Sequence, residues 1–115
     1  MNENVWTQAN SVSFSNSLRS DNQVKIYSLW DNSNLYFAYD VKDANLEAAN
    51  LKLWEDDGGE IYLDTLNDKS ASTDLDDRHF MTNINNLVNL AGSATVKTAR
   101  NSTGYTMEIA IPWTV

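Results

Sequence analysis

A tryptophan, several carboxylates and two glycines lie close together between Leu53 and Thr65, in the segment LWEDDGGEIYLDT. Trp54 is followed directly by acidic residues, whereas a core tryptophan usually lies within an apolar run. An indole ring can stack on the C–H face of a sugar, while neighbouring carboxylates accept hydrogen bonds from its hydroxyls. The segment therefore indicates a sugar platform, although a loop tryptophan that closes the end of a β-sandwich would give the same pattern.

The residues around Trp54 predict how it is presented. Gly58 and Gly59 favour a tight turn. From residue 60 to residue 64, polar and apolar side chains alternate, which is typical of a half-buried strand. We therefore expect Trp54 on a loop at the mouth of a sheet.

The acids near Trp54 also permit a catalytic reading. Asp56, Asp57 and Glu60 could supply the carboxylate pair of a small glycosidase, but the required separation across the scissile bond cannot be obtained from sequence. Adjacent acids in a loop are more commonly solvated or ligating. His79 is the only histidine, so a site with two histidine ligands is excluded and a Ser-His-Asp triad has no independent support.

A long polar loop, NDKSASTDLDD, follows the strand after Trp54. Hard oxygen ligands concentrated in one loop suit calcium, although their spacing is not that of an EF-hand. A solvated acidic loop is the alternative, and the sequence leaves both open. The candidate calcium ligands are Asp64, Asp68, Asp74, Asp76 and Asp77.

Composition limits the class of protein. The 115 residues are enough for one domain, expected to span 1–115, and the 16 acidic against 8 basic residues give a net charge of -8. This charge argues against a nucleic-acid partner and against an anionic membrane surface. The chain has no cysteine, which excludes disulfides and thiolate metal sites. It also has no apolar run of transmembrane length.

Several short alternating segments at near-regular spacing predict an all-β fold, an antiparallel β-sandwich of the jelly-roll or immunoglobulin-like type. Polar turns at 31–34 and 100–104 predict hairpins, 16–22 is expected to be a polar loop, and 43–52 a loop with one short helical turn. Trp30 shares a strand face with Val24 and Ile26, so it is expected in the core. The predicted strands cover 24–30, 35–41, 60–66, 79–85, 94–99 and 105–111, with a short alternation at 12–14 and an ambiguous stretch at 86–93.

Three segments, LWDNSNLYFAYDVKDA, LWEDDGGEIYLD and GYTMEIAIPW, resemble in this order the hallmark segments of the family 9 carbohydrate-binding modules and their DOMON-like relatives. The resemblance implies a jelly-roll-like sandwich, often with structural calcium, tethered to a glycoside hydrolase in a secreted enzyme. It implies binding without catalysis to β-linked plant polysaccharide, above all β-1,4-glucans such as amorphous cellulose, xyloglucan and mixed-linkage glucan.

The resemblance also implies site residues. Trp54 matches one of two tryptophans that sandwich a sugar in that family, and Glu60 and Asp43 match polar ligands of the same pocket. Met81 stands where the family has an arginine that helps to hold the sugar.

The family's second sandwiching tryptophan falls beyond the last residue of this sequence, so we expect a shortened relative with a more open site. Trp113 is the expected replacement, because the strand that ends there could neighbour the one after Trp54. Asp57 and Tyr62 complete the candidate sugar-binding set.

Some DOMON-like relatives bind haem through histidine and methionine, which gives a rival hypothesis, an electron-transfer domain. His79 and Met81 are two residues apart on a predicted strand and would point to the same face. Met107 would therefore have to supply the second axial ligand. Methionines more commonly fill core gaps, which is the alternative role for both.

Overall fold

The computed structural model describes residues 3–49, 52–89 and 94–115. Within these residues all regular structure is strand or 3-10 turn, and no helix is long and apolar enough to cross a membrane. The elements are η1 (Asn4–Gln8), β1 (Asn10–Asn16), β2 (Arg19–Trp30), β3 (Asn34–Lys42), η2 (Leu53–Glu55), β4 (Gly58–Asp64), β5 (Asp77–Asn83), β6 (Thr95–Arg100) and β7 (Gly104–Pro112).

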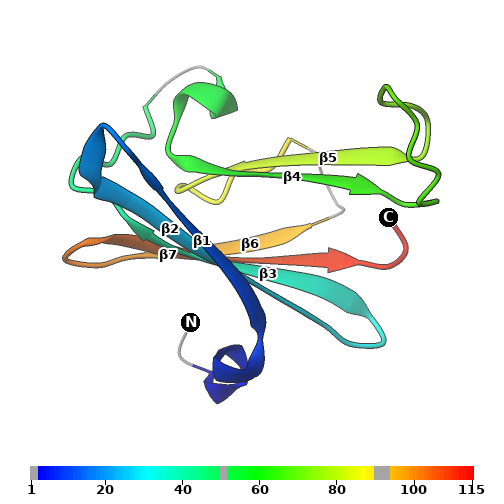
Figure 1. Cartoon of the computed structure of the whole chain (residues 1–115), viewed down its shortest axis with the longest axis horizontal. Helices are drawn as coiled ribbons and strands as arrows, with labels where there is room; N and C mark the ends of the chain where they lie inside the picture. Colours follow the sequence, from blue (N-terminus) through cyan, green and yellow to red (C-terminus); the bar gives the residue numbers. More distant parts are fainter. Residues whose placement is uncertain (1–2, 50–51, 90–93) are drawn as a thin grey trace.

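The strands form two antiparallel sheets packed face to face. One has five strands in the order β1-β2-β3-β7-β6, and the other has two, β4 and β5. Figure 1 shows β4–β5 lying across β3, β7 and β6 as a separate layer. The predicted antiparallel β-sandwich is therefore confirmed.

The core fills the space between the sheets. Ile61 and Phe80, a cross-strand pair on β4–β5, face Tyr39, Met107 and Ile109 of the five-stranded sheet, and all five side chains are buried. Their removal from water is the main favourable contribution to folding. Polar contacts also tie the layers together, because the Tyr39 hydroxyl donates a 3.4 Å hydrogen bond to a carbonyl of β4. Burial raises the pKa of Tyr39 to about 12, so this phenol remains a donor.

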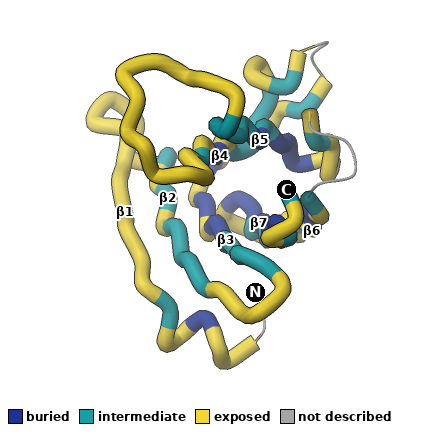
Figure 2. The backbone as a smooth tube through the Cα atoms, turned by 90° about the vertical axis from the view of Figure 1, so that its right-hand side faces the viewer, coloured by how far each residue is buried: buried dark blue, intermediate teal, exposed yellow. Residues whose placement is uncertain are grey.

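Trp30 is not in the core, which corrects the prediction from its strand face. Its side chain is 69% exposed, and Val12 and Phe14 on the same sheet face are also exposed. Trp30 does share a sheet face with Val24 and Ile26, as the side-chain alternation predicts. However, β4–β5 is only two strands wide and does not cover this part of the face. Figure 2 shows β1 and much of β2 extending beyond the second layer.

Two predicted loops differ from the structure. The segment 16–22 is mostly strand, because Asn16 pairs with Arg19 and only two residues form the turn between β1 and β2. The helical turn expected within 43–52 is absent from its described residues and comes just afterwards, as η2. In the ambiguous stretch, Val88 forms an isolated bridge with Thr82, while 90–93 lie outside the described residues.

Candidate functional site

Six side chains form what we call the outer face of β4–β5, the face turned away from the five-stranded sheet. It follows from the strand register, because Ile61 and Phe80 point inward and their neighbours along each strand must point outward. The residues of this outer face are the cross-strand pairs Glu60 and Met81, Tyr62 and His79, and Asp64 and Asp77.

Three of these side chains form an ordered group. The rings of Tyr62 and His79 are stacked, with centroids 4.0 Å apart and planes inclined by 8°. The Tyr62 hydroxyl donates to Glu60 Oε2 over 3.3 Å, and His79 Nε2 lies 3.2 Å from the same oxygen. Partial desolvation and then the Glu60 charge raise the pKa of Tyr62, so its phenol stays protonated and able to donate.

Trp54 lies on η2, beside the start of β4. Its side chain is 62% exposed, and Figure 1 shows η2 on the outer side of β4–β5. The turn is fixed from both ends, since Glu55 N–H donates to the Lys52 carbonyl and Asn83 Nδ2 donates to Asp56. The Lys52 ammonium is 5.4 Å from the Trp54 ring centroid. The turn that carries the exposed Trp54 and the acid–aromatic group thus lie on the same side of β4–β5.

Asp43 lies elsewhere, directly after the end of β3, the middle strand of the five-stranded sheet, and is only 5% exposed. Its carboxylate accepts hydrogen bonds from Arg19 (3.2 Å), Asn22 (2.9 Å) and the backbone N–H of Asn45 (2.9 Å). These three donors occupy most of the carboxylate's roughly four acceptor positions and leave little capacity for a sugar. The structure therefore gives Asp43 a bracing position and does not bring it to the outer face.

Asp57 also accepts a hydrogen bond inside the molecule, from the backbone N–H of Glu47 at 2.5 Å. With Asp43 and the start of β4 it lines a cleft of about 350 Å³ between the layers. The side chain of Glu60 instead contacts Tyr62 and His79. The predicted sugar-binding set is therefore divided between this cleft and the outer face.

Trp113 is not beside Trp54. The last strand, β7, pairs with β3 and β6 and not with β4, so the expected adjacency is wrong. Trp113 lines a cleft of about 250 Å³ with Leu63 and Asp64, at the opposite end of β4 from Trp54. Seven extended residues separate those ends, roughly 20 Å, and a direct role of Trp113 in sugar binding stays a prediction.

The acidic loop after β4 is organised by hydrogen bonds to its carboxylates. Asp64 accepts from the backbone N–H groups of Asp68 and Lys69, and Asp76 accepts from that of Leu66. The five predicted calcium ligands meet in two groups that share Asp76, with ligand atoms in each group within 4.8 Å of one another: Asp64, Asp76 and Asp77, and Asp68, Asp74 and Asp76. Such hard oxygen donors fit calcium.

Crowding in this loop affects protonation. The hydrogen bond that protonated Asp76 donates to Asp74, followed by partial desolvation, raises the pKa of Asp76, and the charges of Asp74 and Asp68 act in the same direction. The same hydrogen bond lowers the pKa of Asp74. The two carboxyls thus share a proton more readily than isolated acids would.

The geometry disfavours the haem hypothesis. Met107 is fully buried between the sheets, where its sulfur accepts from Thr82 Oγ1, while His79 and Met81 lie on the outer face of β4–β5. A strand and the buried core therefore separate His79 from the methionine it would need. The glycosidase hypothesis is weakened similarly, since Asp56 and Asp57 hold neighbouring chain segments and Glu60 points to another face.

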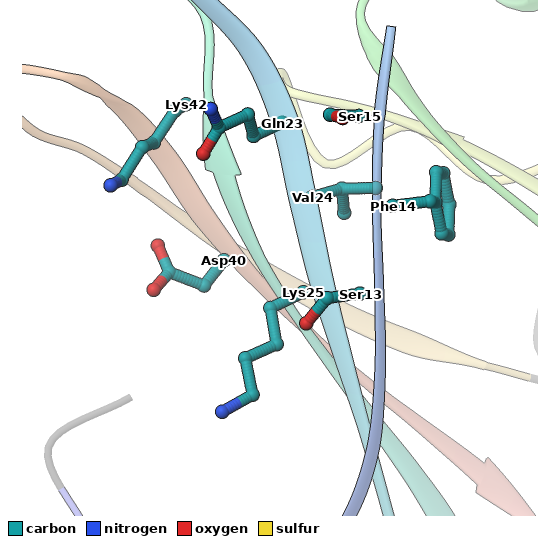
Figure 3. Close-up of a pocket in the computed structure, with 8 residues that line it drawn as sticks. All are labelled: Ser13, Phe14, Ser15, Gln23, Val24, Lys25, Asp40 and Lys42. Carbon is teal, nitrogen blue, oxygen red and sulfur yellow. The ribbon is translucent and has the colours of Figure 1, made fainter.

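A hollow of about 450 Å³ lies over β1, β2 and β3. Figure 3 shows Lys25, Asp40 and Lys42 extending to one side of these strands, with the Phe14 ring on the other. Its polar side therefore lacks an exposed aromatic face, and it is a weaker candidate for sugar stacking than the Trp54 side.

Comparison with known families decides between these readings. The family model described as "Carbohydrate family 9 binding domain-like" matches residues 1–115. The chain belongs to this family. The resemblance noted in the sequence is thereby confirmed, and the chain is a member of a family of carbohydrate-binding modules.

Two solved structures resemble this family 9 module closely. A carbohydrate-binding module of family 9 from Caldicellulosiruptor kristjanssonii in complex with cellotriose superposes with a TM-score of 0.84 at 26% sequence identity, covering 98% of this chain and 60% of that one. The same organism's family 9 module in complex with glucose gives a TM-score of 0.82, also at 26% identity, and covers 96% of this chain and 60% of that one.

Curated relatives are much longer proteins. Exoglucanase XynX of Acetivibrio thermocellus is 34% identical over 91 residues, which cover 75% of this chain and 8% of the relative. Endo-1,4-beta-xylanase A of Thermotoga neapolitana is 37% identical over 102 residues, covering 84% of this chain and 10% of the relative. The chain thus spans about a tenth of the length of these relatives.

Proposed function

We propose that this family 9 module binds β-1,4-linked glucan chains without catalysing their cleavage, and that Trp54 and the outer face of β4–β5 form the binding surface. The observation that carries the proposal is that the exposed Trp54 belongs to η2, which lies on the same side of β4–β5 as the Glu60, Tyr62 and His79 group. The related modules hold cellotriose and glucose, which are the ligand chemistry expected here.

The chemistry of the surface suits such a ligand. The equatorial hydroxyls of β-1,4-glucans leave flat C–H faces on which an indole stacks. The Glu60 carboxylate accepts hydrogen bonds from hydroxyls at the sugar's rim, and the Tyr62 hydroxyl both donates and accepts. We expect a dissociation constant on the order of 10 to 100 μM, since a few stacked sugars gain little beyond the cost of association.

Trp54 is widely exposed, and Trp113 lies at the opposite end of β4. An exposed indole can stack on sugars within a long chain as well as on a chain end. Amorphous cellulose, xyloglucan and mixed-linkage glucan are therefore the proposed natural ligands. Because the relatives are an exoglucanase and xylanases, we further propose that the module is secreted as part of a glycoside hydrolase and holds that enzyme on its substrate.

The test is affinity electrophoresis across soluble β-glucans, xylan and mannan, followed by calorimetry with cellotriose. The parent should be retarded by β-glucans, and Trp54→Ala should lose at least about 2 kcal/mol of binding free energy, as expected of a hot-spot aromatic residue. Trp30→Ala is the matched control, because it removes an indole of similar exposure from the other sheet. Absence of retardation on every polysaccharide, or equal loss in both variants, would contradict the proposal.

We also propose that the acidic loop binds calcium. The support is the clustering of Asp64, Asp68, Asp74, Asp76 and Asp77, together with the raised pKa of Asp76 among its acidic neighbours. A calcium ion would neutralise this charge and fix a loop whose side chains are mostly exposed. Its role would be structural, because the loop follows β4 and lies away from Trp54, which precedes the strand.

A further inference from the structure

His79 joins the two other members of the ordered group on the outer face of β4–β5. It stacks on Tyr62 and approaches Glu60, although β4 and β5 are connected by a long loop. We propose that His79 is a positioning residue of the sugar surface, which holds the Glu60 carboxylate and the Tyr62 ring in their binding geometry. This inference rests on the proposed function and assigns a residue that controls its affinity.

The orientation of the Glu60 carboxylate depends on where its hydrogen-bond donors lie. Tyr62 and His79 both approach the same oxygen of Glu60, Oε2. A carboxylate has about four acceptor positions, so two donors on one oxygen fix its orientation and leave capacity for sugar hydroxyls. Without His79, a glutamate with 43% side-chain exposure would sample several rotamers and lose freedom on binding.

Tyr62 is 62% exposed, and without the His79 stack its ring would turn freely about its side-chain bonds. The stacked imidazole holds one face of the phenol ring. His79 is itself held, because Asn89 Nδ2 donates to the His79 carbonyl and Asn89 Oδ1 accepts from the backbone N–H of Met81. The contacts that position the sugar surface therefore extend through β5 to Asn89, which follows that strand.

Charged and aromatic groups surround His79 on the outer face. The groups that face His79 are Glu60 and Tyr62 from β4, with Asp77 next to it on the same face of β5 and Asp64 diagonally opposite. The contact with Tyr62 is a ring stack and the contact with Glu60 is a hydrogen bond, so the two can be removed separately.

Two substitutions separate the contributions of the ring and the donor. His79→Phe retains an aromatic ring against Tyr62 and removes the donor to Glu60. His79→Gln retains an N–H donor and removes the stack. Calorimetry with cellotriose, after a check of melting temperature, compares both with the parent, with His79→Ala, which removes both contacts, and with Asp40→Asn, a control on the other sheet.

His79→Ala should bind cellotriose about two- to tenfold more weakly than the parent, the range of one ordinary hydrogen bond. His79→Phe and His79→Gln should each recover part of that loss, because each keeps one of the two contacts. Equal affinity of the parent and all three variants would overturn the inference while leaving the Trp54 surface intact. If the parent binds no β-glucan, the proposed function fails, and the inference fails with it.

Discussion

The indole Nε1 of Trp113 donates a hydrogen bond to the backbone carbonyl of Asp31 over 2.8 Å. The backbone N–H of Trp113 also donates to the Ser33 carbonyl at 3.0 Å. The segment after β7 is thereby attached to the turn between β2 and β3, which lie in the same sheet. This relationship gives Trp113 a stabilising role that does not require a sugar.

Trp113→Phe should therefore lower the free energy of unfolding by about 1 kcal/mol, because the ring remains and one hydrogen bond is lost. Affinity for cellotriose should not change. Urea unfolding and calorimetry measure the two effects on the same protein. A variant with normal stability and weakened sugar binding would instead return Trp113 to the binding surface.

Asp31 predicts a pH effect on stability. Its carboxylate accepts from the backbone N–H groups of Ser33 and Asn34 and from the Tyr36 hydroxyl, which lowers its pKa from 3.8 in the folded state. A carboxyl whose pKa is lower when folded contributes stability that is fully present above its unfolded pKa. That contribution is lost as pH falls through the folded pKa.

The check is thermal unfolding of the parent and Asp31→Asn at pH 7 and at pH 3. Asparagine can still accept the two backbone hydrogen bonds but does not titrate, so the variant should lose less melting temperature between the two conditions. An identical loss in both proteins would show that Asp31 does not contribute to acid sensitivity.

Strand positions were largely predictable, because side-chain alternation reports which face a strand buries. The hairpin of β2 and β3 and the last strand were recognised from the apolar positions around Ile26, Phe37 and Ile109. Trp30 was misplaced because the pattern shows a face but not the width of the opposing sheet. Only the arrangement of β4–β5 over β3 and β7 determines which part of that face is covered.

The candidate site was partly predictable. Trp54, Glu60 and Tyr62 could be found because they lie within nine residues of one another in the sequence. The partnership of Tyr62 with His79 depends on the register of β4 against β5, across a long loop that fixes no register by its length. The contact between Asp43 and Arg19 could not be predicted for a related reason, since 24 positions separate the two residues in the sequence.

Calcium should raise the melting temperature if the acidic loop binds it. An ion that binds only the folded state adds about 2.7 kcal/mol at a concentration one hundred times its dissociation constant, which is roughly 10 °C for a domain of this size. Asp76→Asn should reduce the increase most, because Asp76 belongs to both carboxylate groups. Asp40→Asn, on the other sheet, is the control. Equal midpoints with calcium and with a chelator would contradict a structural ion.

The start of β4 has no room for a side chain at Gly58. A Cβ there would overlap the backbone carbonyl oxygen of Thr82 and lie 2.9 Å from the Cα of Asn83. Both are backbone atoms of the paired strand, so neither can rotate away. At Gly59 the nearest atom is 3.0 Å away and belongs to the Tyr39 ring, a side chain with more freedom to adjust.

Gly58→Ala should therefore destabilise the fold by about 1–3 kcal/mol or more through overpacking, and by more than Gly59→Ala. The strand must move away from β5, which would also shift Glu60 and weaken its contact with His79. Urea unfolding measures the stability of both variants, and calorimetry with cellotriose measures the shift in the binding surface. If Gly58→Ala matches Gly59→Ala in both measurements, the close approach of β4 and β5 at Thr82 does not constrain the site.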